Sequence, residues 1–252
     1  MFTNKLALIT GVSSGIGYST MLALLEKNCR VIGIVSSELR RTEVLEKLSF
    51  KTFSDTGAVD LRVCDLASET AIDTLAKELK KEGLLPDFLI LNAGVGVYGP
   101  HEELSTRELV RMTAVNFTAP LLLTNLFLRP LKERNGHILF ISSITAQKTN
   151  NTHGCAYGAT KAGISSFAKS LFEEVRKYDV RVTVLSPDLT RTELYRNASF
   201  TASEADDASL SPKEVADYAV FALSARNGLN LTEITMQPQH HRLVKKPGNR
   251  SL

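Results

Sequence analysis

Two side chains in the second half of the chain have the types and the spacing for proton transfer. Tyr157 and Lys161 are four positions apart, so on a helix both lie on one face. A phenol with an ordinary pKa of about 10 is a poor base at neutral pH, but a neighbouring ammonium favours the phenolate. Tyr157 could then take a proton from an alcohol or give one to a carbonyl oxygen. By itself such a pair is most often an exposed helix face, so its surroundings decide the interpretation.

A glycine-rich turn follows the first apolar run of the chain. Glycines permit a tight turn and the close approach of a ligand, while the start of a helix offers free N–H groups to a pyrophosphate. An ordinary turn between a strand and a helix is the alternative interpretation. The position of the glycine-rich turn after the first strand favours its interpretation as a dinucleotide-binding site. The residues expected to contact the dinucleotide are Gly11, Ser13, Ser14, Gly15, Ile16 and Gly17.

These motifs lie within a regular alternation of short apolar runs and longer segments of helical periodicity. We expect strands at 6–10, 30–35, 59–64, 88–91, 137–142, 180–185 and 231–236. We expect helices at 15–27, 38–48, 68–81, 105–131, 157–178 and 212–224. The alternation predicts a single α/β domain with a doubly wound, parallel, seven-stranded sheet of the Rossmann type. Ligands of such sheets bind at the carboxyl ends of the strands.

Polar motifs follow four further strands of the predicted sheet. Asp65 and Leu66 follow the third strand, and Asn92-Ala93-Gly94 follows the fourth. Ser143 follows the fifth strand, and the segment from Pro187 to Thr192 follows the sixth. Each motif alone is common at a strand end. Their order and separation along one chain are not.

As a set, these motifs resemble the short-chain dehydrogenase/reductase family. The glycine turn has the family's G-x-x-x-G-x-G spacing, and the resemblance extends over nearly the whole chain to about Gln237. It implies an oxidoreductase that moves a hydride between a nicotinamide dinucleotide and the carbonyl or alcohol carbon of a small organic substrate. The C-terminal stretch 211–238 further resembles the subgroup of NADP-dependent 3-hydroxy acid and serine dehydrogenases and carbonyl reductases.

The resemblance implies a catalytic tetrad of Asn116, Ser143, Tyr157 and Lys161. Tyr157 is the expected general acid and base, and Ser143 the expected hydrogen-bond partner of the substrate oxygen. Asn116 is expected to bend its helix and to hold, on its backbone carbonyl, a water that links Lys161 to solvent.

The resemblance also implies where the cofactor lies. Asp65 is expected at the adenine amino group, the Asn92-Ala93-Gly94 motif beside the adenosine, and Thr192 at the nicotinamide carboxamide. Beyond the glycine turn, the expected cofactor contacts are Ser36, Ser37, Arg40, Asp65, Leu66, Asn92, Ala93, Gly94, Tyr157, Lys161, Pro187 and Thr192.

The chain departs from the family pattern at two places. The interval from Ser143 to Tyr157 is one residue longer than usual, and we place the extra residue in the loop 148–153. Asp188 stands where the family has a glycine. It must therefore adopt a left-handed conformation, or the turn must differ. Its carboxylate could also face the substrate.

The end of the second strand bears on the choice of dinucleotide. In these folds an acidic residue there binds the ribose 2′-hydroxyl, whereas a 2′-phosphate needs donors or cations instead. Ser36, Ser37 and Arg40 could serve a phosphate. Against this, Glu38 could repel one, and Ser14 is not the basic residue that many NADP-using members carry. The sequence favours NADP over NAD.

Composition excludes other classes of protein. The chain has 252 residues with 30 Lys and Arg against 27 Asp and Glu, a net charge of +3 that gives no reason to expect a nucleic-acid partner. The most apolar stretch, 118–128, is too short to cross a bilayer, and the first residues lack a secretory pattern. Neither disulfide nor metal spacing occurs among Cys29, Cys64 and Cys155, which favours a reducing, cytoplasmic setting. The histidines show no ligand spacing and are interpreted as structural or solvent-facing: His101, His137, His153, His240 and His241.

We expect a catalytic domain over residues 1–239, with a substrate loop at about 188–210, and a basic, flexible tail over 240–252. We also expect a homodimer or homotetramer that packs the helical segments 107–131 and 167–178 against a symmetry mate. The apolar residues for this contact are Leu109, Met112, Leu126, Phe167, Leu171 and Phe172.

Two alternatives stay open. The first is a non-catalytic redox sensor that binds NADP(H), although such proteins typically lose the tyrosine or lysine, and both are present here. The second is reduction of a ketoacyl group on an acyl carrier protein, which implies a basic docking surface. That surface would consist of Arg107, Arg111, Arg129, Lys132 and Arg134, although a solvated helix face explains these residues more simply.

Overall fold

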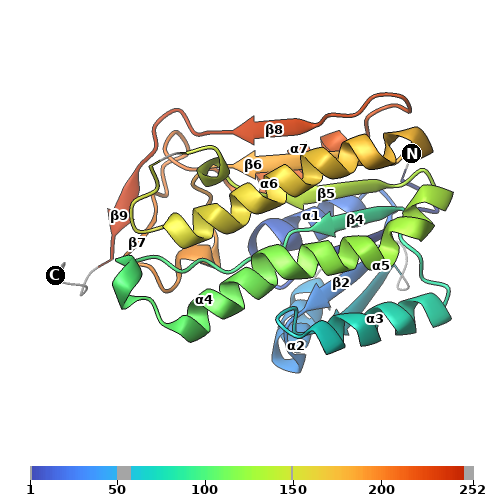
Figure 1. The fold of residues 1–252 in the computed structure, drawn as a ribbon, viewed down its shortest axis with the longest axis horizontal. Helices are drawn as coiled ribbons and strands as arrows, with labels where there is room; N and C mark the ends of the chain where they lie inside the picture. The colour runs from blue at the N-terminus through green and yellow to red at the C-terminus, as the bar shows by residue number, and fades with distance from the viewer. Residues whose placement is uncertain (1, 50–57, 149, 247–252) are drawn as a thin grey trace.

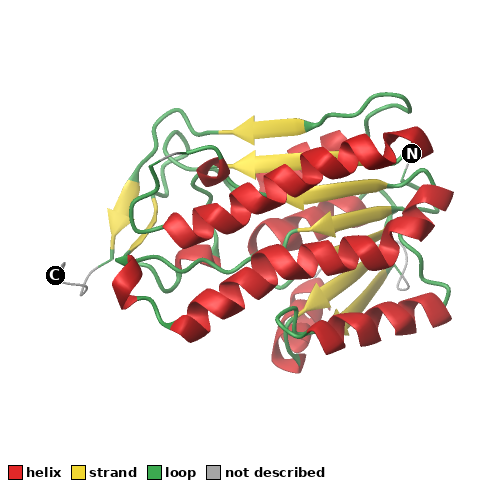
Figure 2. Cartoon of the chain, viewed as in Figure 1, coloured by secondary structure: helices red, strands yellow, loops and turns green. Residues whose placement is uncertain are grey.

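The computed structural model describes residues 2–49, 58–148 and 150–246 and has the predicted α/β architecture. Its main sheet has seven strands in the order β3-β2-β1-β4-β5-β6-β8 (Figures 1 and 2). All neighbouring strands in this sheet pair in parallel. The strands are β1 (Leu6–Thr10), β2 (Arg30–Val35), β3 (Val59–Val63), β4 (Phe88–Leu91), β5 (His137–Ile141), β6 (Arg181–Pro187) and β8 (Glu233–Met236).

Helices cover both faces of this sheet. The helices are α1 (Gly15–Leu25), α2 (Glu38–Ser49), α3 (Glu69–Lys81), α4 (Thr106–Thr113), α5 (Ala119–Glu133), α6 (Cys155–Val175) and α7 (Pro212–Leu223). Helices α3, α5 and α6 lie on one face of the sheet and α1, α2 and α7 on the other (Figure 1). Each group packs on the sheet through its own apolar core. Because both faces are covered, β1, β4 and β5 are buried along their whole length and are continuous apolar runs.

The strand order reverses between β1 and β4, which are neighbours although β2 and β3 separate them in sequence. Crossovers on the two sides of this point leave the sheet in opposite directions, and the carboxyl ends of β1 and β4 therefore border a crevice. The glycine turn and the Asn92-Ala93-Gly94 motif both follow these strands. The fold thus brings the predicted motifs to one edge of the sheet.

The helix predicted over 105–131 is interrupted. Ser105 caps α4 by accepting a hydrogen bond from the backbone N–H of Glu108, and a π-helical segment, Ala114–Thr118, separates α4 from α5. Single π-helical turns within α-helices are frequent at functional sites. Four predicted strands also differ from the observed bounds by one or two residues: β3 and β5 at their ends, β8 at its start and β6 at both.

A second, small sheet was not predicted. Strands β7 (Phe200–Ala202) and β9 (Leu243–Lys245) pair antiparallel and join the substrate loop to the C-terminal segment. The sequence predicts a flexible tail from residue 240, whereas residues 240–246 hydrogen-bond to that loop. The rest of the predicted tail lies outside the described residues. Within the described ranges, no helix combines the length and the apolar character that crossing a bilayer requires.

Candidate active site

A cavity of about 490 Å³ lies at the carboxyl ends of the central strands. It is lined by nearly all the predicted catalytic and cofactor-binding residues. Of this set, only Gly17 and Asn116 are not part of its wall. The predicted residues that line it are Gly11, Ser13, Ser14, Gly15, Ile16, Ser36, Ser37, Arg40, Asp65, Leu66, Asn92, Ala93, Gly94, Ser143, Tyr157, Lys161, Pro187 and Thr192.

The glycine turn forms one end of this cavity. Gly11 and Gly15 have φ of 74° and 58°, in the region that favours glycine. A Cβ on Gly17 would lie 2.3 Å from the Gly11 oxygen, so Gly17 is needed for the packing of the turn. The side chain of Asn92 fastens the turn to β4, since its Nδ2 donates to the oxygens of Thr10 at 2.9 Å and Gly11 at 3.1 Å.

This turn fits an anionic ligand. Helix α1 begins at Gly15, and the side chain of the preceding Ser14 makes no capping hydrogen bond to it. The N–H groups of the first turn of α1 are thus left to whatever occupies the cavity, together with the positive end of the helix dipole. A pyrophosphate satisfies both, and a nicotinamide dinucleotide fits the donors that are present.

Asp65 faces an arginine at the expected adenine end. Its carboxylate accepts hydrogen bonds from Arg111 Nη2 at 3.1 Å and from the Ala67 N–H at 3.1 Å. The hydrogen bond from Arg111 is the main reason that the pKa of Asp65 lies below its ordinary value. Sequence reasoning missed Arg111 here, because it assigned this residue to a solvated helix face or, alternatively, to a docking surface. Val115, four residues later, also lines the cavity, but no sequence pattern marked either residue.

The end of β2 carries the residues that the sequence predicted to lie near the ribose. Ser37 Oγ accepts from the Arg40 N–H at 3.3 Å, and the Arg40 guanidinium pairs with Glu43 at 2.8 Å and Glu193 at 3.6 Å. Glu38 is exposed, pairs with Arg41 at 3.4 Å and is not part of the cavity wall. The acidic residue that could have repelled a phosphate therefore points elsewhere in this structure.

Tyr157 and Lys161 lie together on the inner face of α6, and each side chain is only 4% exposed. Lys161 Nζ donates to the Ile141 oxygen at 2.8 Å and lies 5.8 Å from the centre of the Tyr157 ring. Burial lowers the pKa of Lys161 to about 8. Burial also raises the pKa of Tyr157, as does the nearby Tyr195, and hydrogen bonds from Ser143 and Tyr98 partly offset this. The site can thus hold a neutral phenol beside a lysine that titrates near neutrality.

Asn116 lies in the π-helical segment, and its side chain is buried. Its Oδ1 accepts from the Val95 N–H at 2.7 Å, and its Nδ2 donates to the Val95 oxygen at 2.9 Å and to Thr160 Oγ1 at 3.2 Å. The side chain therefore joins the segment after β4 to α6. The proton relay expected of its backbone carbonyl stays a prediction.

Asp188, in place of the usual glycine, is buried in the wall of the cavity. It is not among the described non-glycine residues with positive φ, so it does not use the left-handed conformation. Its carboxylate accepts from the Leu189 N–H at 2.8 Å and from Gln237 Nε2 at 3.4 Å, and it pairs with His241 Nδ1 at 3.1 Å. The carboxylate is therefore bound to the C-terminal segment, a contact that the sequence interpretation of His241 did not include.

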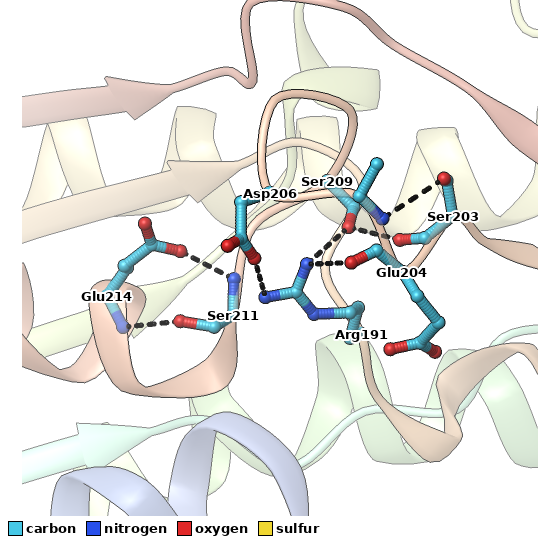
Figure 3. A network of polar contacts seen from close by, with 8 residues as sticks. Arg191, Ser203, Glu204, Asp206, Ser209, Ser211 and Glu214 are labelled. Atoms are coloured by element: carbon cyan, nitrogen blue, oxygen red, sulfur yellow. Dashed lines mark hydrogen bonds and ion pairs between the residues drawn. The ribbon is translucent and has the colours of Figure 1, made fainter.

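The substrate loop is fastened at several points. Arg191 donates to Ser209 Oγ at 3.1 Å and to the Glu204 oxygen at 3.3 Å, and it pairs with Asp206 at 3.1 Å (Figure 3). In the same view, Ser211 and Glu214 form a capping box at the start of α7. Arg191 thus holds together three other residues of the loop predicted at about 188–210.

An aromatic group stands beside Tyr157 and was also missed by sequence reasoning. Tyr98 follows β4, and its ring centre lies 5.4 Å from that of Tyr157. Tyr195 and Phe200, from the substrate loop, pack on Tyr98 with ring centres 5.9 and 5.4 Å away. We call Tyr98, Tyr195 and Phe200 the aromatic wall. Tyr98 lies in a loop, Tyr195 in a 3-10 helix of three residues and Phe200 in a strand of three residues, so no periodicity marked them.

A family model and two curated relatives assign this chain to the same family. The family model described as short chain dehydrogenase matches residues 5–202. A fatty acyl-CoA reductase of Acinetobacter baylyi is 32% identical over 231 residues, which cover 88% of this chain and 74% of that protein. An uncharacterized oxidoreductase of Staphylococcus saprophyticus is 28% identical over 236 residues, covering 93% and 97%.

A solved structure agrees with these relatives. A metagenomic short-chain oxidoreductase in complex with NADP is 26% identical, with a TM-score of 0.78 over 94% of this chain and 98% of that one. Since the family model covers most of the chain and the fold, the motif order and the cavity agree with it, the protein belongs to the short-chain dehydrogenase/reductase family.

Proposed function

We propose that this protein transfers a hydride between NADP(H) and the carbonyl or secondary alcohol carbon of a small organic substrate, with Tyr157 as the general acid and base. The observation that supports it most is the convergence of two motif sets in one cavity. The glycine turn lines this cavity, and so do Ser143, Tyr157 and Lys161. Family membership supports the reaction class.

Each residue has a task in this proposal. When bound, the nicotinamide supplies or accepts the hydride. The Ser143 hydroxyl holds the substrate oxygen and stabilises charge that develops on it. The Tyr157 phenol gives its proton to that oxygen during reduction and takes it back during oxidation. Lys161, with a pKa lowered to about 8, favours the phenolate and can exchange protons near neutral pH.

The preference for NADP rests on the ribose end of the cavity. Ser36 leaves space and a hydroxyl where an NAD enzyme would place a carboxylate, Arg40 lines the same wall, and Glu38 points outward. The NADP complex of the metagenomic relative supports this choice. Membership of the hydroxy acid and carbonyl reductase subgroup stays a prediction, and neither the structure nor the comparisons give support to the redox-sensor alternative.

The proposal includes a symmetric homo-oligomer through α4, α5 and α6. Met112 and Leu171 belong to the core of the monomer, which removes them from the predicted contact. Leu126, Phe167 and Phe172 are only partly buried against that core. Together with Leu109, which is also partly exposed, they are left for a second copy.

The test is a screen of carbonyls and alcohols with NADPH and NADH, followed by Tyr157→Phe. We expect this variant to lose turnover by about 10²-fold or more while its affinity for the dinucleotide is retained, because only the proton carrier is removed. Tyr218→Phe on the exposed face of α7 is the matched control and should keep the wild-type rate. Near wild-type turnover of Tyr157→Phe would refute the proposed mechanism.

A further inference from the structure

A tyrosine outside the predicted tetrad is packed against Tyr157. The two rings of Tyr98 and Tyr157 are inclined by 47°, with their centres 5.4 Å apart. The Tyr98 ring packs against Gly96, a position that has no side chain. A Cβ on Gly96 would lie 2.6 Å from Tyr98 Cε2. Gly96 therefore makes room for this ring beside Tyr157, which lines the cavity.

The rest of the aromatic wall fixes Tyr98 from the other side. The rings of Tyr195 and Phe200 also contact each other, with centres 5.4 Å apart. Lys246 Nζ, from the segment after β9, donates to the backbone oxygens of Tyr195 at 2.6 Å and Arg196 at 2.9 Å. Both partners of Tyr98 are thus tied to the C-terminal segment, Phe200 through β7 and β9.

The packed rings bring the two phenols close enough for each to influence the pKa of the other. Burial raises the pKa of Tyr98 well above its ordinary value, so this phenol stays protonated and available as a donor at neutral pH. Its hydrogen bond lowers the pKa of Tyr157 and so opposes the effect of burial on that group. Ser143 supplies the other hydrogen bond to the same phenol.

We propose that Tyr98 is a positioning residue for Tyr157: its ring holds the Tyr157 ring in place, and its hydroxyl donates a hydrogen bond to the Tyr157 oxygen. The inference rests on the proposed function, in which Tyr157 carries the transferred proton. The donated hydrogen bond stabilises the phenolate, the form that accepts a proton from an alcohol. Alcohol oxidation should therefore depend on Tyr98 more strongly than carbonyl reduction does.

The variant Tyr98→Phe isolates the hydroxyl, since it keeps the ring and its packing. We would record the pH dependence of alcohol oxidation with NADP⁺, using the best alcohol from the screen, for the wild type and for this variant. The rise in kcat/KM with pH should move upward by about one pH unit, with a fall of about tenfold in kcat/KM at neutral pH. Dinucleotide affinity should not change.

Two further variants separate the hydrogen bond from packing. Phe200→Leu disturbs the aromatic wall but keeps the Tyr98 hydroxyl, so we expect a higher KM without a shift of the pH profile. Tyr218→Phe is the control for loss of a tyrosine hydroxyl elsewhere. As a readout independent of turnover, ultraviolet difference titration of the NADP⁺ complex, with Tyr157→Phe as the blank, should show the Tyr157 transition at higher pH in Tyr98→Phe.

The outcomes distinguish the two proposals. A wild-type pH profile and rate in Tyr98→Phe, with turnover abolished in Tyr157→Phe, would overturn the role of Tyr98 and leave the proposed function standing. A shift of the pH profile in Tyr98→Phe equal to that in Phe200→Leu would assign Tyr98 to packing alone. It would also overturn the proposed role of Tyr98. Retained turnover in Tyr157→Phe would instead refute the proposed function.

Discussion

Replacing Lys161 by Met should raise the free energy of unfolding at neutral pH while removing activity. The Lys161 ammonium is buried, which lowers its pKa from 10.5 to about 8. Below pH of about 8 the lysine is charged in both the folded and the unfolded chain, and the fold carries the full cost of burying the charge. Between about 8 and 10.5 only the unfolded chain still binds the proton, so the free energy of unfolding rises with pH. Above that range the cost is gone.

The size of the effect follows from the separation of the two pKa values. A shift from 10.5 to about 8 corresponds to about 3 kcal/mol. About 2 kcal/mol of this should be regained by the wild type between about pH 7 and about pH 9.5, the window accessible to measurement. Lys161→Met has no charge to bury, so its stability relative to the wild type should be greatest at the low end and should decline by that amount across the window.

The assay is urea unfolding of both proteins across this pH window, compared as the difference in unfolding free energy. Taking this difference cancels the contributions of groups that titrate equally in the variant and the wild type. Lys169→Met is the matched control, because Lys169 lies on the same helix with a 59% exposed side chain paired to Glu233. Its difference from the wild type should not change with pH. A Lys161→Met difference that is constant across the window, or that grows with pH, would refute the assignment of a buried, destabilising charge to Lys161.

Two other predictions concern the cofactor and the assembly. Ser36→Asp should weaken NADPH binding strongly and leave NADH binding unchanged or improved, because a carboxylate would meet the 2′-phosphate with a repulsion on the order of a few kcal/mol. Arg40→Ala should weaken NADPH only. Fluorescence titration with both dinucleotides measures these changes, and a wild type that prefers NADH, with neither substitution altering the ratio, would contradict the NADP proposal. Light scattering of a dilute sample should give the mass of a dimer or tetramer, with Phe167→Glu shifting it toward the monomer and Tyr218→Glu on α7 leaving it in place; a wild type that is monomeric throughout would contradict the proposed contact.

The sequence predicted the main sheet and the cavity wall for related physical reasons. Strands buried on both faces must be continuous apolar runs, which identified β1, β4 and β5 almost to the residue. Parallel strands bring their carboxyl ends to one edge, so motifs far apart in the chain, such as Gly11 and Lys161, could be expected in one cavity. These residues line one cavity because of the sheet topology, and the local sequence pattern is sufficient to predict that topology.

The features that were missed depend on contacts with no local signature. Tyr98 is a single aromatic residue in a loop, and only the fold reveals that it faces Tyr157. Strand β9 is three exposed residues in a basic segment, and its pairing with β7 supplies the order that its composition does not. The interruption of the helix at Ala114–Thr118 likewise accompanies a tertiary contact, the pairing of Asn116 with the backbone of Val95.

The pairing of β7 with β9 has a consequence for the order of assembly. All seven strands of the main sheet precede β9 in the chain, so a ribosome makes every one of them before the segment that fastens the substrate loop. Chains begin to fold from the N-terminal side during synthesis. The glycine turn and the walls for the dinucleotide can therefore form while Tyr195 and Phe200 still lack their support from Lys246 and β9. The nascent chain therefore completes the strands of its dinucleotide-binding sheet before the segment that supports the aromatic wall.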